Sequence, residues 1–272
     1  MESFFLPARV GSRFCVHHPP AKGVTLNQAV VFVPAFAEEM NKSRHVVAQT
    51  ARRFAALGIG VLLIDLLGCG DSTGSLEDAT WDAWRDDIDL ASGWLHDYGY
   101  RRLLVWGMRL GGLLAAECAA DPGGAYERCI LWQPVVSGDT FLSQFLRLAV
   151  ANVMLSGSTA GVSVAQLRSR LAGGETIEVA GYPLTPALAA SLGLAALTRP
   201  LCPVEWFEVV AEHGRAPSPA ALRVAEGWRA NGTEVTMKAV GGESFWGAAN
   251  AAELVQCPTL VDATASAAES WV

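Results

Sequence analysis

The chain has 272 residues, of which 51% are apolar and 17% charged, and its formal net charge is −7. This high apolar and low charged content excludes an intrinsically disordered protein. Lys and Arg form no basic stripe, which argues against a nucleic acid partner. The length suits one large α/β domain.

The longest apolar runs, residues 29–37 and 61–67, are much shorter than the roughly 18 residues of a membrane-spanning helix. They fit strands that are buried on both faces. Residues 1–13 lack the pattern of a signal peptide, so we expect a cytoplasmic protein. The six cysteines have no CxxC spacing and are expected to be free thiols without a zinc site.

Strands and helices alternate over the first half of the chain. The predicted strands are short apolar runs at residues 29–33, 61–65, 103–106 and 129–132. The predicted helices have apolar residues three or four positions apart and cover residues 43–57, 80–98 and 113–120. This alternation indicates a doubly wound, mostly parallel sheet, in which functional residues follow the carboxyl ends of the strands.

The alternation stops between residues 135 and 200. Helices are expected here at 140–155, 164–171 and 185–197, with a short strand at 176–180. We interpret residues 135–200 as a helical lid inserted into a core domain of residues 1–134 and 201–272. The core resumes with a strand at 204–210, a helix at 218–230, a strand at 234–240 and a helix that starts near Asn250.

The segment Gly107-Met108-Arg109-Leu110-Gly111 follows a predicted strand and precedes a predicted helix. A Gly-x-X-x-Gly pattern in this place is typical of the nucleophile elbow of α/β hydrolases, because the two glycines leave room around a strained turn. Arg109 occupies the position of the nucleophile. A guanidinium group stays protonated and is a poor nucleophile, so we expect no serine-type acyl transfer.

The other two members of a Ser-His-Asp triad are also missing from their usual places. The histidine should follow the strand at 234–240, where the chain has Glu243 and no histidine. The acid should follow the strand at 204–210, where Glu212 lies beside His213. Glu212 and Glu243 are therefore candidate catalytic groups without a histidine to orient.

Several longer segments together resemble one bacterial family. They are VPAFAEEMNKSR at 33–44, DLLGCGDS at 65–72, ATWDAWRDD at 79–87, the Arg109 turn, and QPVVSG at 133–138. With these segments the chain resembles exosortase A system-associated hydrolase 2, a family found beside exopolysaccharide and exosortase genes. The resemblance implies an α/β-hydrolase fold and an esterase, thioesterase or acyltransferase class of activity. It also implies partners among exopolysaccharide or exosortase proteins. A homodimer is a further possibility that the sequence leaves open.

Parts of a hydrolase site are nevertheless expected to remain. The loop at Ala35 and Phe36 and the amide of Leu110 would supply the two N–H groups of an oxyanion hole. With Arg109 and a helix N-terminus, they favour an anionic ligand such as a carboxylate, a phosphate or an acidic sugar.

An internal partner for the arginine is an alternative to an external anion. Glu38, Glu39 and Glu243 lie on loops that should converge on the turn, so one of them could pair with Arg109. The two interpretations can coexist if the glutamate orients the arginine. Glu38 is for this reason included among the candidate ligand-binding residues.

Two further interpretations stay open. The first is an enzyme with a displaced catalytic set, drawn from Cys69, Ser72, Ser137, Ser244, Glu212 and His213. The second is a non-catalytic scaffold, suggested by nine tryptophans and the apolar segment 135–200. The polar face of the helix at 80–98 carries Asp82, Asp86, Asp87 and Asp89, which we interpret as a solvated face and not as a metal site. The chain has no nucleotide-binding motif, so no cofactor is expected.

Overall fold

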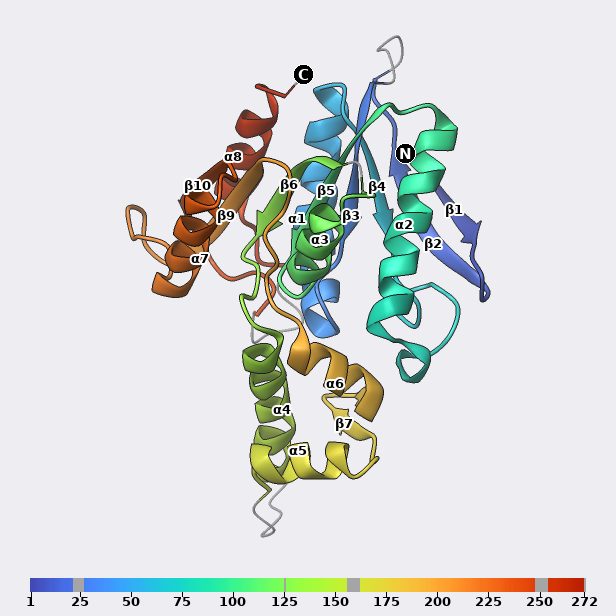
Figure 1. Cartoon of the computed structure of the whole chain (residues 1–272), viewed down its shortest axis with the longest axis vertical. Helices are drawn as coiled ribbons and strands as arrows, with labels where there is room; N and C mark the ends of the chain where they lie inside the picture. Colours follow the sequence, from blue (N-terminus) through green and yellow to red (C-terminus); the bar gives the residue numbers. More distant parts are fainter. Residues whose placement is uncertain (22–26, 125, 156–161, 248–253, 272) are drawn as a thin grey trace.

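The computed structural model describes residues 1–21, 27–124, 126–155, 162–247 and 254–271 (Figure 1). Within these residues, an eight-stranded sheet has the order β1-β2-β4-β3-β5-β6-β9-β10. Its strands are β1 (Glu2–Pro7), β2 (Ser12–His18), β3 (Gln28–Val33), β4 (Gly60–Ile64), β5 (Arg102–Met108), β6 (Tyr126–Trp132), β9 (Val204–Val210) and β10 (Val235–Gly241). From β4 to β10 neighbouring strands are parallel, which confirms the predicted fold class.

The sheet is covered on both faces by helices (Figure 1). One face packs against α1 (Glu38–Ala56) and α8 (Pro258–Ala268). The other face packs against α2 (Trp81–Tyr98), α3 (Gly111–Ala120) and α7 (Pro219–Ala230). All six residues of β3 are buried, as expected for a central parallel strand.

Helix α1 begins five residues before the position that its apolar spacing predicts. Its first turn holds Glu38 and Glu39, whose charges are favourable at a helix N-terminus. Its N-cap residue, Ala37, has a φ of 54° and no capping side chain, so the start carries no capping signal in the sequence. The predicted start of the last helix, Asn250, lies outside the described residues, and α8 begins at Pro258.

The first two strands were not predicted. Strands β1 and β2 form an antiparallel hairpin, and β2 also pairs antiparallel with β4. Nine of the hairpin's thirteen strand residues are exposed or half-buried, because it lies at the sheet edge. Polar residues such as Arg13 and His17 occupy buried positions of β2, so the hairpin lacks the continuous apolar runs of the central strands.

The segment between β6 and β9 forms a lobe beyond the carboxyl ends of the strands (Figure 1). It contains α4 (Gly138–Leu155), α5 (Val164–Ala172), the hairpin of β7 (Ile177–Val179) and β8 (Tyr182–Leu184), and α6 (Pro186–Leu194). Strand β8 was not predicted, because three residues after the Gly181 turn give too short a pattern. No helix among the described residues is long and apolar enough to span a membrane.

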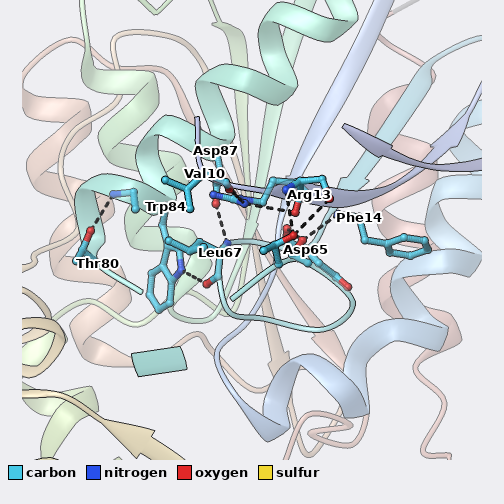
Figure 2. Close-up of polar contacts among 12 residues, drawn as sticks. Val10, Arg13, Phe14, Asp65, Leu67, Thr80, Trp84 and Asp87 are labelled. Atoms are coloured by element: carbon cyan, nitrogen blue, oxygen red, sulfur yellow. Dashed lines mark hydrogen bonds and ion pairs between the residues drawn. The ribbon is translucent and has the colours of Figure 1, made fainter. Parts of the chain in front are cut away.

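A buried ion pair joins the hairpin to α2 and to the loop after β4 (Figure 2). Arg13 Nε donates to Asp87 Oδ1 at 2.6 Å, and the two side chains are 4% and 3% exposed. Asp87 Oδ2 also accepts the N–H of Leu67 at 2.7 Å. The assignment of Asp87 to the solvated face of its helix was therefore wrong, because its carboxylate meets partners from two distant segments.

Candidate functional site

A sharp turn joins β5 to α3, and Arg109 stands at its centre with a φ of 54°. A Cβ atom on Gly107 would lie 2.5 Å from the carbonyl oxygen of Gly111, and one on Gly111 would lie 2.2 Å from that of Pro34. Such contacts are impossible without movement of the backbone. The two glycines therefore let the N-terminus of α3 pack directly against the loop after β3.

We expect Gly111→Ala to lower the free energy of unfolding by about 1–3 kcal/mol, because the added methyl group must push backbone atoms apart. Gly227→Ala is the matched control. Gly227 is an exposed residue within α7, and a Cβ there meets nothing within 4 Å. Alanine should therefore raise stability at Gly227 by about 0.5–1 kcal/mol. Urea unfolding measures both changes, and equal effects at the two positions would contradict the close packing.

The guanidinium group of Arg109 has an internal partner. Its Nε and Nη2 atoms donate to Glu39 Oε1 at 3.1 and 3.0 Å, and Nη1 donates to the carbonyl oxygen of Gln133 at 3.4 Å. The ring of Trp246 lies 5.4 Å from the guanidinium carbon. The side chains of Arg109 and Glu39 remain 16% and 23% exposed. Of the three candidate glutamates, Glu39 is the one that pairs with the arginine.

Behind the arginine lies a second buried acid, which the sequence analysis missed. Gln133 Nε2 donates to Glu208 Oε2 at 3.2 Å, and Trp206 Nε1 donates to Glu208 Oε1 at 2.8 Å. Burial raises the pKa of Glu208, while the hydrogen bond from Trp206 and the nearby charge of Arg109 oppose the rise. The available signal was the presence of two acidic residues, Glu205 and Glu208, inside the mainly apolar strand β9, since a buried acid needs partners.

The loop after β3 is buried beside the turn. Ala35, Phe36 and Leu110 are all buried. In the described part of the chain, the N–H groups of Phe36 and Leu110 have no hydrogen-bond partner. The ring of Phe36 meets Phe145 of α4 at 5.1 Å between centroids, so the lobe packs on this loop.

The remaining candidates lie away from the guanidinium group. Glu38 is exposed and accepts from the Tyr182 hydroxyl at 3.1 Å. Glu212, His213, Glu243 and Ser244 are exposed, and none contacts Arg109 within the described ranges. The structure thus brings Arg109 together with Glu39 and Trp246, and not with Glu38, Glu212 or Glu243.

The candidates for a displaced nucleophile have structural roles. The Ser72 hydroxyl donates to the carbonyl oxygen of Asp65 at 2.5 Å and accepts the N–H of Phe14. Ser137 accepts the N–H of Thr140 at the start of α4. Burial raises the pKa of the Cys69 thiol to about 12, so it is protonated at neutral pH. Among the described residues no cluster of His, Cys, Asp or Glu has the arrangement of a metal site.

The mostly parallel sheet, the helices on its two faces and the tight β5–α3 turn define an α/β-hydrolase fold. The family model described as Hydrolase_4, serine aminopeptidase S33, matches residues 25–171, which is more than half of the chain. The chain therefore belongs to this family. A comparison with curated protein sequences finds no match.

Solved structures share the fold at low sequence identity. Est1E from Butyrivibrio proteoclasticus, bound to ferulic acid, is similar with a TM-score of 0.70 and 13% identity over 98% of this chain and 97% of that one. Alpha/beta hydrolase domain-containing protein 10 from mouse has a TM-score of 0.59 and 17% identity over 88% of each chain. XC6422 from Xanthomonas campestris, a serine hydrolase without a lid, has a TM-score of 0.59 and 14% identity over 100% of this chain and 94% of that one.

Proposed function

We propose that this hydrolase-fold protein binds an anionic small molecule at Arg109 and does not perform serine-type hydrolysis. The observation that carries the proposal is the guanidinium group at the centre of the β5–α3 turn, where a hydrolase of this fold holds its nucleophile. A protonated guanidinium cannot attack an acyl carbon, but its planar N–H groups match a carboxylate or a phosphate.

The loop after β10 supports the absence of a triad. In the standard arrangement this loop supplies the histidine, and here it places the ring of Trp246 beside the guanidinium group. His213 is exposed after β9 and contacts none of the other site residues that the structure describes. A serine placed at position 109 would therefore lack the histidine that removes its proton in the standard mechanism.

The hydrogen bonds of Arg109 leave room for a ligand. The guanidinium group has five N–H donors. Glu39 accepts one at Nε and one at Nη2, and the carbonyl oxygen of Gln133 accepts one at Nη1. Among the described residues the other two donors have no partner, and neither do the N–H of Phe36 in the loop after β3 and that of Leu110 at the N-terminus of α3. In this proposal Glu39 orients the guanidinium group, and the remaining donors bind the carboxylate of an acidic sugar or acyl compound.

The lobe of residues 135–200 acts as the lid of this site in our proposal. Its support is the contact of α4 with the site loop, where Phe36 meets Phe141 and Phe145. The resemblance to the exosortase A-associated family supports a cytoplasmic role beside exopolysaccharide or exosortase proteins. It also suggests the ligand class, since acidic sugars are common in exopolysaccharides.

Calorimetric titration with glucuronate, citrate and sulfate tests the ligand, with glucose as the neutral control. Arg109→Gln should weaken binding about tenfold or more, because a hydrogen bond to a charged group contributes about 1.5–3 kcal/mol. Arg53→Gln is the matched control, since Arg53 forms an exposed ion pair with Asp262. If the wild type binds none of these anions and Glu39→Gln gains binding, Glu39 blocks the arginine and the proposal fails.

Hydrolysis is tested separately with a panel of esters and thioesters. We expect no turnover above buffer for the wild type or for Arg109→Ser, because neither has a histidine beside the turn. Turnover by the wild type that Cys69→Ala abolishes would instead establish a displaced catalytic set.

A further inference from the structure

A cavity of about 360 Å³ lies between α1 and the strands β2, β3 and β4, apart from the Arg109 site. Its wall is mainly apolar and includes Phe14 and Val16 of β2, Phe32 of β3, and Val47 of α1. Figure 2 shows the ring of Phe14 pointing away from the Arg13–Asp87 ion pair, and Phe14 lines the cavity. A concave, mostly apolar cavity of this size is typical of small-molecule sites.

Arg44 lies at one end of the cavity, and only part of its guanidinium group is hydrogen-bonded. Arg44 donates through Nη2 to the two oxygens of Asp65 at 3.0 and 2.9 Å, and its side chain is 45% exposed. In the described part of the chain, its Nε and Nη1 atoms have no hydrogen-bond partner. Asp65 is the one acid in the cavity wall, and it also accepts the N–H of Asp71. The free donors at this end therefore suit an anion.

The rest of the wall does not favour a cationic ligand. His18 lines the cavity and is buried. Burial lowers the pKa of His18, and nearby positive charge, including that of Arg52, lowers it further. His18 is thus neutral at pH 7 and adds no negative charge to the wall.

We propose that this cavity binds a medium-chain aliphatic carboxylate. The alkyl chain packs among Phe14, Val16 and Val47, and the carboxylate accepts hydrogen bonds from Arg44 at the open end. Apolar burial supplies most of the affinity, and the charged group fixes the orientation. This site is independent of the proposed function at Arg109, because neither Arg109 nor its partner Glu39 lines the cavity, whereas Arg44 and its partner Asp65 do.

Titration calorimetry with decanoate on the full chain tests the proposal, with decanol as the uncharged probe. Ala48 is half-buried in the cavity wall, so Ala48→Phe fills the space and should weaken both probes about tenfold or more. Ala56→Phe is the matched control, because Ala56 is exposed at the end of the same helix. Arg44→Gln should weaken decanoate about tenfold and leave decanol unchanged.

The outcomes separate this cavity from the Arg109 site. Arg109→Gln should leave decanoate binding unchanged while it weakens glucuronate. Decanoate binding that survives Ala48→Phe but is lost in Arg109→Gln would show that decanoate binds at the Arg109 site, and it would overturn this proposal. Absence of decanoate binding by the folded wild type would overturn it as well, without affecting the result for glucuronate.

Discussion

Asp87→Ala is expected to lower the free energy of unfolding by about 3–5 kcal/mol, because it leaves the buried charge of Arg13 without an anionic partner. The change also removes the acceptor of the Leu67 N–H. Trp84 Nε1 donates to the carbonyl oxygen of the same residue, Leu67, so the loop after β4 is held from both sides (Figure 2). Loss of the carboxylate should therefore loosen this loop as well as the hairpin.

Urea unfolding measures the loss, and Asp86→Ala is the matched control. Asp86 is the exposed neighbour of Asp87 on the same helix, so its change should stay within about 0.5 kcal/mol. The double replacement Arg13→Met with Asp87→Leu should recover much of the stability, because it removes both buried charges together. A loss below about 1 kcal/mol in Asp87→Ala would contradict the assigned role of the ion pair.

The sheet could be predicted where its strands are continuous apolar runs. Strand β9 has the predicted bounds although Glu205 and Glu208 interrupt its apolar run. Strand β3 starts one residue before the predicted position, and β4 is shifted by one residue at both ends; both are mainly apolar runs. Such strands are buried on both faces, so every residue carries the same signal. The hairpin of β1 and β2 lies at the sheet edge, where more side chains are exposed to solvent. Its pattern of apolar and polar residues was too mixed to recognise as a strand.

The sequence predicted the location of the Arg109 turn, but it did not predict which glutamate pairs with Arg109. The Gly-x-X-x-Gly pattern located the turn, since close backbone contact demands glycine at two fixed positions. The choice of Glu39 over Glu38 could not be made, because two adjacent glutamates differ only in the direction that α1 gives them. Glu208 and Asp87 were missed because a buried acid is defined by distant partners, and one sequence does not reveal which segments meet.

Acidification from about pH 7.5 to pH 4.5 is expected to lower stability by about 2–3 kcal/mol through His17 alone. The ring is fully buried, and Nε2 lies 2.9 Å from the Tyr100 hydroxyl. Burial, followed by the charges of His18 and the N-terminus, lowers the pKa of His17 from 6.5 to about 4. The unfolded chain therefore binds more protons than the folded chain between these values. The stabilising effect of a neutral His17 is complete above pH 6.5 and is lost as the pH falls towards 4.

Comparison with His17→Phe isolates this contribution from that of the carboxyl groups. The phenyl ring can keep the edge contacts with Trp94 and Tyr98, which lie 5.0 and 4.7 Å from the imidazole between ring centroids. The variant loses the hydrogen bond to Tyr100, so it should be less stable at neutral pH. It should nevertheless lose about 2–3 kcal/mol less than the wild type on acidification, because phenylalanine binds no proton. Parallel profiles for wild type and His17→Phe would show that the imidazole has the same pKa in the folded and unfolded chains, and they would exclude its burial as the source of the pH dependence.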